Sequence, residues 1–434
     1  MDQVKRTVAI ATLGCKTNQF ESAAMEERLR EAGYQVIPFE EGADLVVVNT
    51  CTVTAATDSQ SRNLIRRARR LNFDCRVIVT GCYAQVDPAV ISSIPGVAMV
   101  IGNDEKKDLL RYLAEEREAQ LVAVDNHGHG RGQLPLSLSS FTERSRAFVQ
   151  IQSGCDAFCS YCIIPYARGS SRSLPVEEVL RQVAGLADRG FPEVVLTGIH
   201  MGAYGKDLEP ETNLLELVRR IEDEIELPRL RLGSLEPTEI PDGLISLMSD
   251  SDKICPHLHI PLQAGDNEVL GRMNRHYDTA FFHQLIERIH RKLPEAAIGL
   301  DVIAGFPGES ESEFENTRRL IENLPISHLH VFPYSRRPGT PAASMPDQVP
   351  RDVARQRCAI LRSLGERKNR SFAEQFIGRV LEVVVEGGNR GGWGRGLARN
   401  YLTVQFRGGS KLQGRRAWVK VEGWNPAGLR GSLL

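Results

Sequence analysis

Residues 148–162 read FVQIQSGCDAFCSYC, an apolar strand that runs directly into three cysteines. These are Cys155, Cys159 and Cys162, spaced C-x3-C-x2-C, with the aromatic Tyr161 before the third. Three thiols do not suit a disulfide, which needs an even number, or a structural zinc, which takes four N or S ligands. A cubic iron-sulfur cluster held by three thiolates keeps one iron open for chemistry. A zinc site with a distant fourth ligand is the alternative.

A second set of three cysteines lies near the N-terminus, at the ends of predicted strands. Short apolar runs over 8–13, 44–49, 76–80 and 97–101 alternate with helical stretches over 21–31, 59–70 and near Pro88. This alternation predicts a parallel sheet covered by helices. Ligands of such sheets gather outside the carboxyl ends of the strands.

Cys15, Cys51 and Cys82 each follow one of these strands, so we expect them on one edge of the sheet. Cys75 precedes its strand and should lie on the opposite edge. Buried core cysteines are the alternative interpretation of the set, because cysteine is often buried for packing alone.

The totals describe an ordinary globular chain of two or three domains. It has 434 residues, 54 Lys and Arg against 55 Asp and Glu, and a net charge of −1. We find no signal peptide pattern and no run of the ~20 apolar residues that span a bilayer. We therefore expect a cytoplasmic protein without a membrane partner, whose thiols stay reduced for metal binding or catalysis.

A second βα series begins at residue 147. Its strands are predicted over 148–153, 194–197, 230–233, 258–262, 298–303 and 328–332. Six such units suggest a partial barrel, whose active site is built from the loops that follow the strands. Polar or small residues recur in these loops, although each alone could be an ordinary turn. We take as cofactor-binding candidates Tyr161, Thr197, Gly198, His200, Gly202, Ser234, Glu236, Gln263, Ile303, Gly305, Pro307, Gly308 and Glu309.

The chain after residue 375 has a different character. Short strands are predicted over 380–385, 401–406 and 417–421, and the glycine-rich run 387–396 is interpreted as a loop. Ten Lys and Arg against three Glu make this part basic, as in small β-barrels that bind nucleic acid. The predicted division is therefore 1–120, a linker over 121–146, a barrel over 147–375 and a β-barrel over 376–434.

These motifs together resemble the radical S-adenosylmethionine (SAM) methylthiotransferase family. The resemblance rests on the C-x3-C-x2-C loop, on LGCKTNQ, NTCTVT and GCYAQ around the dispersed cysteines, and on HIPLQ and HVFPYSRRPGT in the barrel. It covers the whole chain: an N-terminal cluster domain, a radical SAM barrel and a C-terminal TRAM domain that contacts RNA. One departure is Ala264-Gly265-Asp266-Asn267, where the family usually has Ser-Gly-Ser/Asp-Asp.

The resemblance implies two [4Fe-4S] clusters and SAM as cofactors. Cys155, Cys159 and Cys162 would hold the cluster that cleaves SAM, and Cys15, Cys51 and Cys82 an auxiliary cluster that supplies or holds the sulfur. An electron donor such as flavodoxin or ferredoxin is implied, and we expect a monomer.

The KTNQ word after Cys15 and the TGIH word at 197–200 look most like the branch that acts on tRNA. That branch converts N6-threonylcarbamoyladenosine at position 37, in the anticodon loop, to its 2-methylthio derivative. Alternatives within the family are N6-isopentenyladenosine in tRNA and an aspartate of a ribosomal protein. An alternative of another class is a non-catalytic RNA-binding protein with structural zinc.

RNA contacts are expected from two basic segments. One is the predicted helix over 59–70, which carries five arginines, and the other is the C-terminal domain with its interleaved aromatic residues. Arginine and aromatic side chains suit phosphate contact and base stacking in an unpaired loop. A solvated helix face is the alternative for the first segment.

Overall fold

The computed structural model describes residues 6–115, 119–125, 145–388 and 392–434. The chain divides into two compact units. The first, here the N-terminal unit, comprises 1–141, 150–174 and 335–343. The second, here the barrel unit, comprises 142–149, 175–334 and 344–434. The loop with the compact cysteine triplet thus belongs to the N-terminal unit, although the sequence places it in the 147–375 segment. Most of the predicted linker lies outside the described residues.

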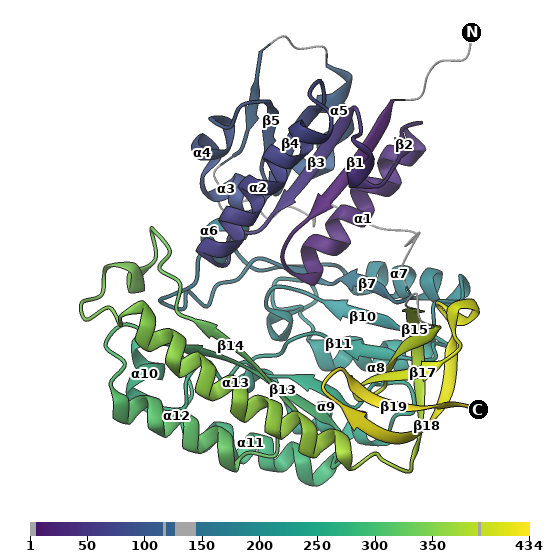
Figure 1. Cartoon of the computed structure of the whole chain (residues 1–434), viewed down its shortest axis with the longest axis vertical. Helices are drawn as coiled ribbons and strands as arrows, with labels where there is room; N and C mark the ends of the chain where they lie inside the picture. The colour runs from purple at the N-terminus through teal and green to yellow at the C-terminus, as the bar shows by residue number, and fades with distance from the viewer. Residues whose placement is uncertain (1–5, 116–118, 126–144, 389–391) are drawn as a thin grey trace. The chain divides into compact units, whose positions relative to one another are not determined.

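A six-stranded parallel sheet forms the centre of the N-terminal unit, with strand order β2-β1-β3-β4-β5-β6 (Figure 1). Its strands are β1 (Thr7–Thr12), β2 (Gln35–Val36), β3 (Leu45–Thr50), β4 (Arg76–Gly81), β5 (Val97–Ile101) and β6 (Leu121–Ala123). Strand β6 extends the sheet beyond the predicted boundary at residue 120, because Leu121, Val122 and Ala123 pair with β5.

The helices of this sheet confirm the predicted βα alternation. They are α1 (Lys16–Glu31), α2 (Ala55–Leu71), α3 (Cys82–Val86), α4 (Pro88–Ser92) and α5 (Leu109–Ala114). Helices α1 and α2 begin earlier than predicted. The Thr54 hydroxyl accepts the Thr57 N–H and the Thr57 hydroxyl accepts the Thr54 N–H, a capping box that fixes the start of α2.

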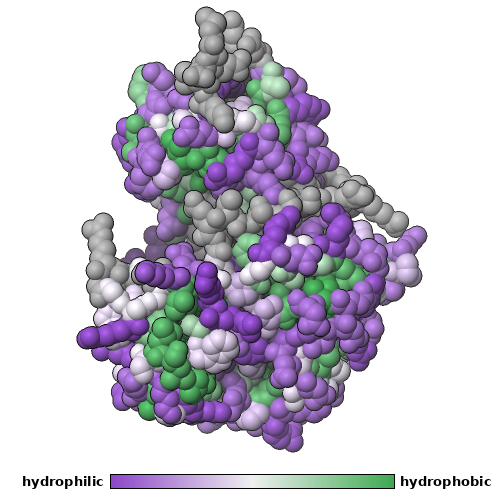
Figure 2. Space-filling model, turned by 90° about the vertical axis from the view of Figure 1, so that its right-hand side faces the viewer, coloured by the Kyte–Doolittle hydropathy of each residue, from purple (hydrophilic) through white to green (hydrophobic). Residues whose placement is uncertain are grey.

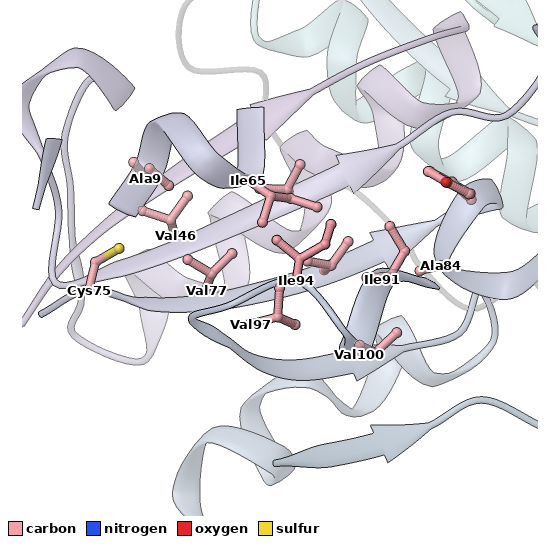
Figure 3. Close-up of a cluster of buried hydrophobic side chains, with 14 of the residues drawn as sticks. Ala9, Val46, Ile65, Cys75, Val77, Ala84, Ile91, Ile94, Val97 and Val100 are labelled. Carbon is pink, nitrogen blue, oxygen red and sulfur yellow. The ribbon is translucent and has the colours of Figure 1, made fainter. Parts of the chain in front are cut away.

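Figure 3 shows part of the apolar core between the sheet and its helices. Val46 and Val77 from the strands pack with Ile65 of α2 in this buried cluster. Cys75, 2 % exposed, lies at one end of the cluster and Ala84 of α3 lies toward the other. The prediction that Cys75 occupies the edge opposite to Cys82 is confirmed.

The barrel unit contains the predicted βα series as two three-stranded parallel sheets, ordered β11-β10-β7 and β12-β13-β14. Isolated parallel bridges, Leu230 with Ile254 and Ser234 with His259, connect the two sheets. The strands are β7 (Ala147–Gln150), β10 (Val194–Thr197), β11 (Leu230–Leu232), β12 (His257–His259), β13 (Ala297–Ala304) and β14 (His328–Pro333). The order β7 to β14 along the sheet is that of a partial barrel.

The α-helices among the described residues of this unit are α7 (Val176–Asp188), α8 (Leu214–Glu224), α9 (Asp242–Asp250), α10 (Asn267–Arg272), α11 (Thr279–Lys292), α12 (Glu311–Asn323) and α13 (Arg351–Glu374). Where their caps are side chains, they are Asn213, Asp266, Asp278 and Ser310, residues that suit an N-terminal cap.

The C-terminal residues form a closed five-stranded barrel ordered β15-β16-β17-β19-β18. Its strands are β15 (Val380–Gly388), β16 (Trp393–Ala398), β17 (Thr403–Arg407), β18 (Arg416–Asn425) and β19 (Gly428–Leu433). The interpretation of 387–396 as a loop was wrong for 387–388, which lie in β15, and for 393–396, which lie in β16. Gly396 faces Val383, and a Cβ there would lie 2.6 Å from Val383 Cγ2, so close packing explains a glycine inside a strand.

A buried ion cluster joins β11 to this closed barrel. Glu193 accepts Arg231 Nε at 2.7 Å, and both side chains are fully buried. Arg229 donates to the Leu397 carbonyl and Arg231 to the Ala398 carbonyl, both in β16. Burial alone would raise the pKa of Glu193, but Arg231, Arg146 and Arg229 lower it to about 2. The cluster therefore fixes the closed barrel on the first sheet of the barrel unit.

Figure 2 shows one face of the molecule, with mostly hydrophilic residues and scattered apolar patches. Within the described part of the chain, no helix combines the length and apolar character needed to cross a membrane.

Candidate functional site

The dispersed cysteines lie together at the carboxyl edge of the N-terminal sheet. Cys15 caps α1, Cys51 follows β3 and Cys82 is the first residue of α3. Thr50 and Gly81 are register partners, so Cys51 and Cys82 leave neighbouring strands at the same level. The prediction that this topology brings the three to one edge is confirmed.

Gly14 makes room for the thiol of Cys51. Its backbone φ is +95°, and a Cβ built on it would lie 2.8 Å from Cys51 Sγ. Cys51 is 4 % exposed and Cys82 is 3 % exposed, whereas Cys15 is open to solvent. Burial, with smaller effects of Cys82 and Cys15, raises the pKa of Cys51 to about 12. The three thiols are thus close enough to interact electrostatically. Cys51 and Cys82 are shielded from solvent.

The compact cysteines occupy a tight loop in the same unit. The Cys155 N–H donates to the Gly169 carbonyl at 3.0 Å and closes the loop. The Cys162 N–H donates to the Cys159 carbonyl at 2.9 Å, so these two cysteines lie one turn apart. Cys159 is 9 % exposed, and Cys155 and Cys162 are half-buried. Tyr161, half-buried, stands inside the turn.

A polar network fully buried in the N-terminal unit connects this loop to the edge of the sheet. It joins Arg168, at the end of α6 (Ile164–Arg168), to Glu21 and Asn18 of α1. Lys106 also pairs with Glu21, at 2.5 Å. Burial alone would raise the pKa of Glu21, but Arg168 and Lys106 lower it to about 2. Because these groups are paired, their charges can remain in the interior.

The segment after β14 completes the site. Arg337 donates to the Thr52 hydroxyl at 2.6 Å and pairs with Asp58 at 2.7 Å. The Ala342 N–H donates to the Ser160 carbonyl, inside the compact cysteine loop, at 2.8 Å. These contacts explain why 335–343 belongs to the N-terminal unit. Sequence reasoning quoted the RRPGT word but gave it no role; an arginine buried at 5 % exposure is the structural signal.

Several predicted cofactor residues of the barrel unit pair with side chains from neighbouring loops of that unit. His200 Nε2 lies 2.9 Å from Glu239 Oε1, and Gly202 packs against the same Glu239. Glu236 pairs with Arg275. Thr197, the last residue of β10, is 4 % exposed, and Gly198 follows it. The loop after β10 is thus held close to the strand end by the contact between His200 and Glu239.

The remaining candidates follow β11, β12 and β13. Ser234 is exposed and pairs with His259 through a bridge, and Gln263 has a φ of +63°. The Gln263 N–H donates to the Asp301 carbonyl, and the Gln263 carbonyl accepts the Ile303 N–H, both at 2.9 Å. These exposed or half-buried groups lie at adjacent strand ends.

Glu309 holds its own loop together. Its carboxylate accepts the Gly305 N–H at 2.6 Å and Arg357 Nη1 at 2.7 Å, and it is 5 % exposed. Burial raises the pKa of Glu309. Pro307 is buried, and Gly308 is exposed with its N–H donated to the Asp347 carbonyl. These hydrogen bonds of Glu309 stabilise the turn at Gly305 and hold the backbone of that turn in a defined position.

Sequence reasoning missed a cluster of histidines around Asp301. His259 Nε2 lies 2.9 Å from one Asp301 oxygen, and His330 Nδ1 lies 3.2 Å from the other. Burial alone would raise the pKa of Asp301, but both histidines hold it well below its ordinary value. His257 and His328 precede them by two residues, and this alternation along two strands was the available signal.

The donor sets fit iron-sulfur clusters. All nine cysteines are described, and no disulfide joins them. Six of them form two groups of three in one unit, and each group combines at least one buried cysteine with at least one that is exposed or half-buried. Thiolate is the ligand that iron-sulfur clusters take in proteins. A cubic cluster held by three thiolates has one iron without a protein ligand.

Comparisons with known proteins define the class first. Residues 149–321 match the Radical SAM superfamily, and residues 7–102 match the Uncharacterized protein family UPF0004. The radical SAM methyltransferase TsrM from Kitasatospora setae, solved with cobalamin and a [4Fe-4S] cluster, has the same fold. It is 18 % identical with a TM-score of 0.58, over 78 % of this chain and 74 % of that chain. The protein is a radical SAM enzyme.

Curated relatives then identify the family. The chain is 43 % identical to threonylcarbamoyladenosine tRNA methylthiotransferase MtaB of Bacillus subtilis, over 96 % of this chain and 93 % of the relative. The MtaB of Aquifex aeolicus is 39 % identical, over 92 % and 97 %. The tRNA-2-methylthio-N(6)-dimethylallyladenosine synthase of Maricaulis maris is 32 % identical, over 100 % and 98 %. The chain belongs to the radical SAM methylthiotransferase family, whose cofactors are SAM and [4Fe-4S] clusters.

Proposed function

We propose that this protein converts N6-threonylcarbamoyladenosine at position 37 of tRNA to its 2-methylthio derivative. The observation that carries the proposal is the presence of two cysteine triplets in one compact unit, in a chain related to MtaB over nearly its whole length. One triplet suits the generation of a radical from SAM, and the other suits the handling of sulfur.

The assignment of residues is part of the proposal. Cys155, Cys159 and Cys162 would hold the cluster that binds SAM, and Cys15, Cys51 and Cys82 would hold the auxiliary cluster. When bound, these groups supply reductive cleavage of SAM and a sulfur for insertion at a C–H carbon. The chain's own task is to bring the reactants together and exclude water.

Individual side chains have distinct roles in this task. Because the ordinary state of the Cys51 thiol is protonated, metal binding there must release a proton. Arg337 fixes the start of α2, next to Cys51, through Thr52 and Asp58. Gln263 and the turn at Gly305 would receive SAM at the strand ends of the barrel unit.

The proposal names tRNA as the partner, contacted through its anticodon loop. On the closed barrel, the indole of Trp418 is 49 % exposed and Arg416 lies over its ring. On α2, Arg66 and Arg70 are exposed. Stacking and phosphate contacts of this kind suit an unpaired loop. A cytoplasmic monomer that receives electrons from a flavodoxin or ferredoxin completes the proposal.

Mass spectrometry of nucleosides from tRNA of a gene-deletion strain tests the substrate. We expect loss of the 2-methylthio-threonylcarbamoyl nucleoside and its return on complementation with the wild-type gene, but not with a Cys15→Ala variant. Loss of the methylthio-dimethylallyl nucleoside instead would select the other relatives' reaction. Unchanged tRNA nucleosides, with a modified ribosomal protein lost, would refute the tRNA proposal.

A further inference from the structure

We propose that Arg168 donates its Nε–H to a sulfur of the auxiliary cluster and thereby adjusts the reduction potential of that cluster. This inference rests on the proposed function, because it requires a cluster on Cys15, Cys51 and Cys82. In this role Arg168 is a positioning residue that changes the reduction potential of the cluster. It is not one of the cluster ligands.

Hydrogen bonds connect Arg168 to the chain segments that carry Cys15 and Cys51. Its Nη2 donates to Asn18 Oδ1 at 2.6 Å. The amide of that same Asn18 donates to the Leu13 carbonyl at 2.7 Å and to the Thr50 carbonyl at 3.0 Å. These two carbonyls stand two residues before Cys15 and one before Cys51. Asn18 therefore ties the guanidinium to the two chain segments that carry these cysteines.

The third cysteine is reached through helix packing. Helix α6, which ends in Arg168, packs against α3, whose first residue is Cys82. Asn103 Nδ2 donates to the Ala167 carbonyl at 2.6 Å and fixes the end of α6. Burial would lower the pKa of Arg168, but the nearby Cys82, Glu21 and Cys15 raise it well above its ordinary value.

The Nε atom is the unexplained group. Arg168 is 2 % exposed, and its two terminal nitrogens are bonded to Glu21 and Asn18. Among the described residues, Nε has no acceptor. A buried donor without a partner is unfavourable, and such groups point to a missing ligand. A sulfide or thiolate at the edge of the sheet would be the acceptor.

The charge balance supports the same role. Glu21 is matched by two cations, Lys106 and Arg168, so this buried group carries one net positive charge. A positive charge and an N–H···S bond both stabilise the more negative, reduced state of a cluster. Arg168 also follows the compact cysteine loop directly, so one residue connects the loop of the first cluster with the surroundings of the second.

The test uses the full chain with Cys155, Cys159 and Cys162 replaced by Ala, so that only the auxiliary cluster forms. In protein labelled with 15N-arginine, pulsed EPR of the reduced cluster should detect a 15N coupling. The coupling should vanish in Arg168→Lys, which keeps the charge and a partner for Glu21. The midpoint potential should become more negative, while the iron content stays the same.

Arg172→Lys is the matched control. Arg172 lies in the same segment and pairs with Asp104 at 2.9 Å, so its replacement should leave both the coupling and the potential unchanged. Absence of a 15N coupling in the Arg168 protein, or an unchanged potential in Arg168→Lys, overturns the inference. Should Arg168→Lys not fold, Arg168→Gln takes its place in both measurements. A chain that binds no iron on the remaining cysteines refutes the proposed function instead.

Discussion

Gly14→Ala provides the sharpest test of how the fold accommodates the auxiliary site. At φ +95° the backbone is left-handed, and a residue with a Cβ is destabilised there by about 1–2 kcal/mol. The added Cβ would also lie 2.7 Å from Cys51 Cβ and 2.8 Å from Cys51 Sγ, and overpacking of this kind costs about 1–3 kcal/mol. We expect a total loss of about 2–5 kcal/mol in the free energy of unfolding, with displacement of the Cys51 thiol.

Gly33→Ala separates the two contributions. Gly33 has a similar φ of +87°, but a Cβ there meets no atom within 4 Å. Its loss should be about 1–2 kcal/mol, from the backbone alone. Urea unfolding of the apo chain and iron content after anaerobic reconstitution are the measurements. If the Gly14→Ala protein were as stable as Gly33→Ala and bound as much iron as the wild type, Gly14 would not be needed to make room for Cys51.

Three further predictions concern the barrel unit. The lowered pKa of Glu193, about 2 against 4.5, contributes stability that is present above pH 4.5 and is lost as the pH falls toward 2. In urea unfolding, Glu193→Gln should therefore lose about 2 kcal/mol less than the wild type between pH 6 and pH 3. Trp418→Ala should weaken tRNA binding about 5- to 150-fold in a fluorescence anisotropy assay, from a base stack worth about 1–3 kcal/mol; Trp424→Ala, at a half-buried position on the core, should lower stability instead. Asp301→Asn should lower the free energy of unfolding by about 1.5–3 kcal/mol at pH 7, because the Asp301 carboxylate accepts hydrogen bonds from both histidines. Equal urea midpoints of the variant and the wild type would contradict this.

The sequence predicted the convergence of Cys15, Cys51 and Cys82 because parallel topology alone brings strand ends together. It did not predict the partners of Arg168 or Arg337, because those pairs join residues far apart in the chain and leave no periodic pattern. Strand β16 was missed because its glycines, of which Gly396 serves close packing, resemble a loop in composition. The histidine alternation around Asp301 was visible, but its register across three strands was not.

The central claim is that two triplets of cysteines hold two clusters with different tasks. The most direct measurement is iron content and SAM cleavage after anaerobic reconstitution of two triple variants, with Cys75→Ala as the control for a buried thiol outside both sets. Wild type and Cys75→Ala should hold about eight irons, and each triple variant about four, by the composition of cubic clusters. The variant without Cys15, Cys51 and Cys82 should still cleave SAM without methylthiolating tRNA. Full iron content in either triple variant, or SAM cleavage without Cys155, Cys159 and Cys162, would contradict the account.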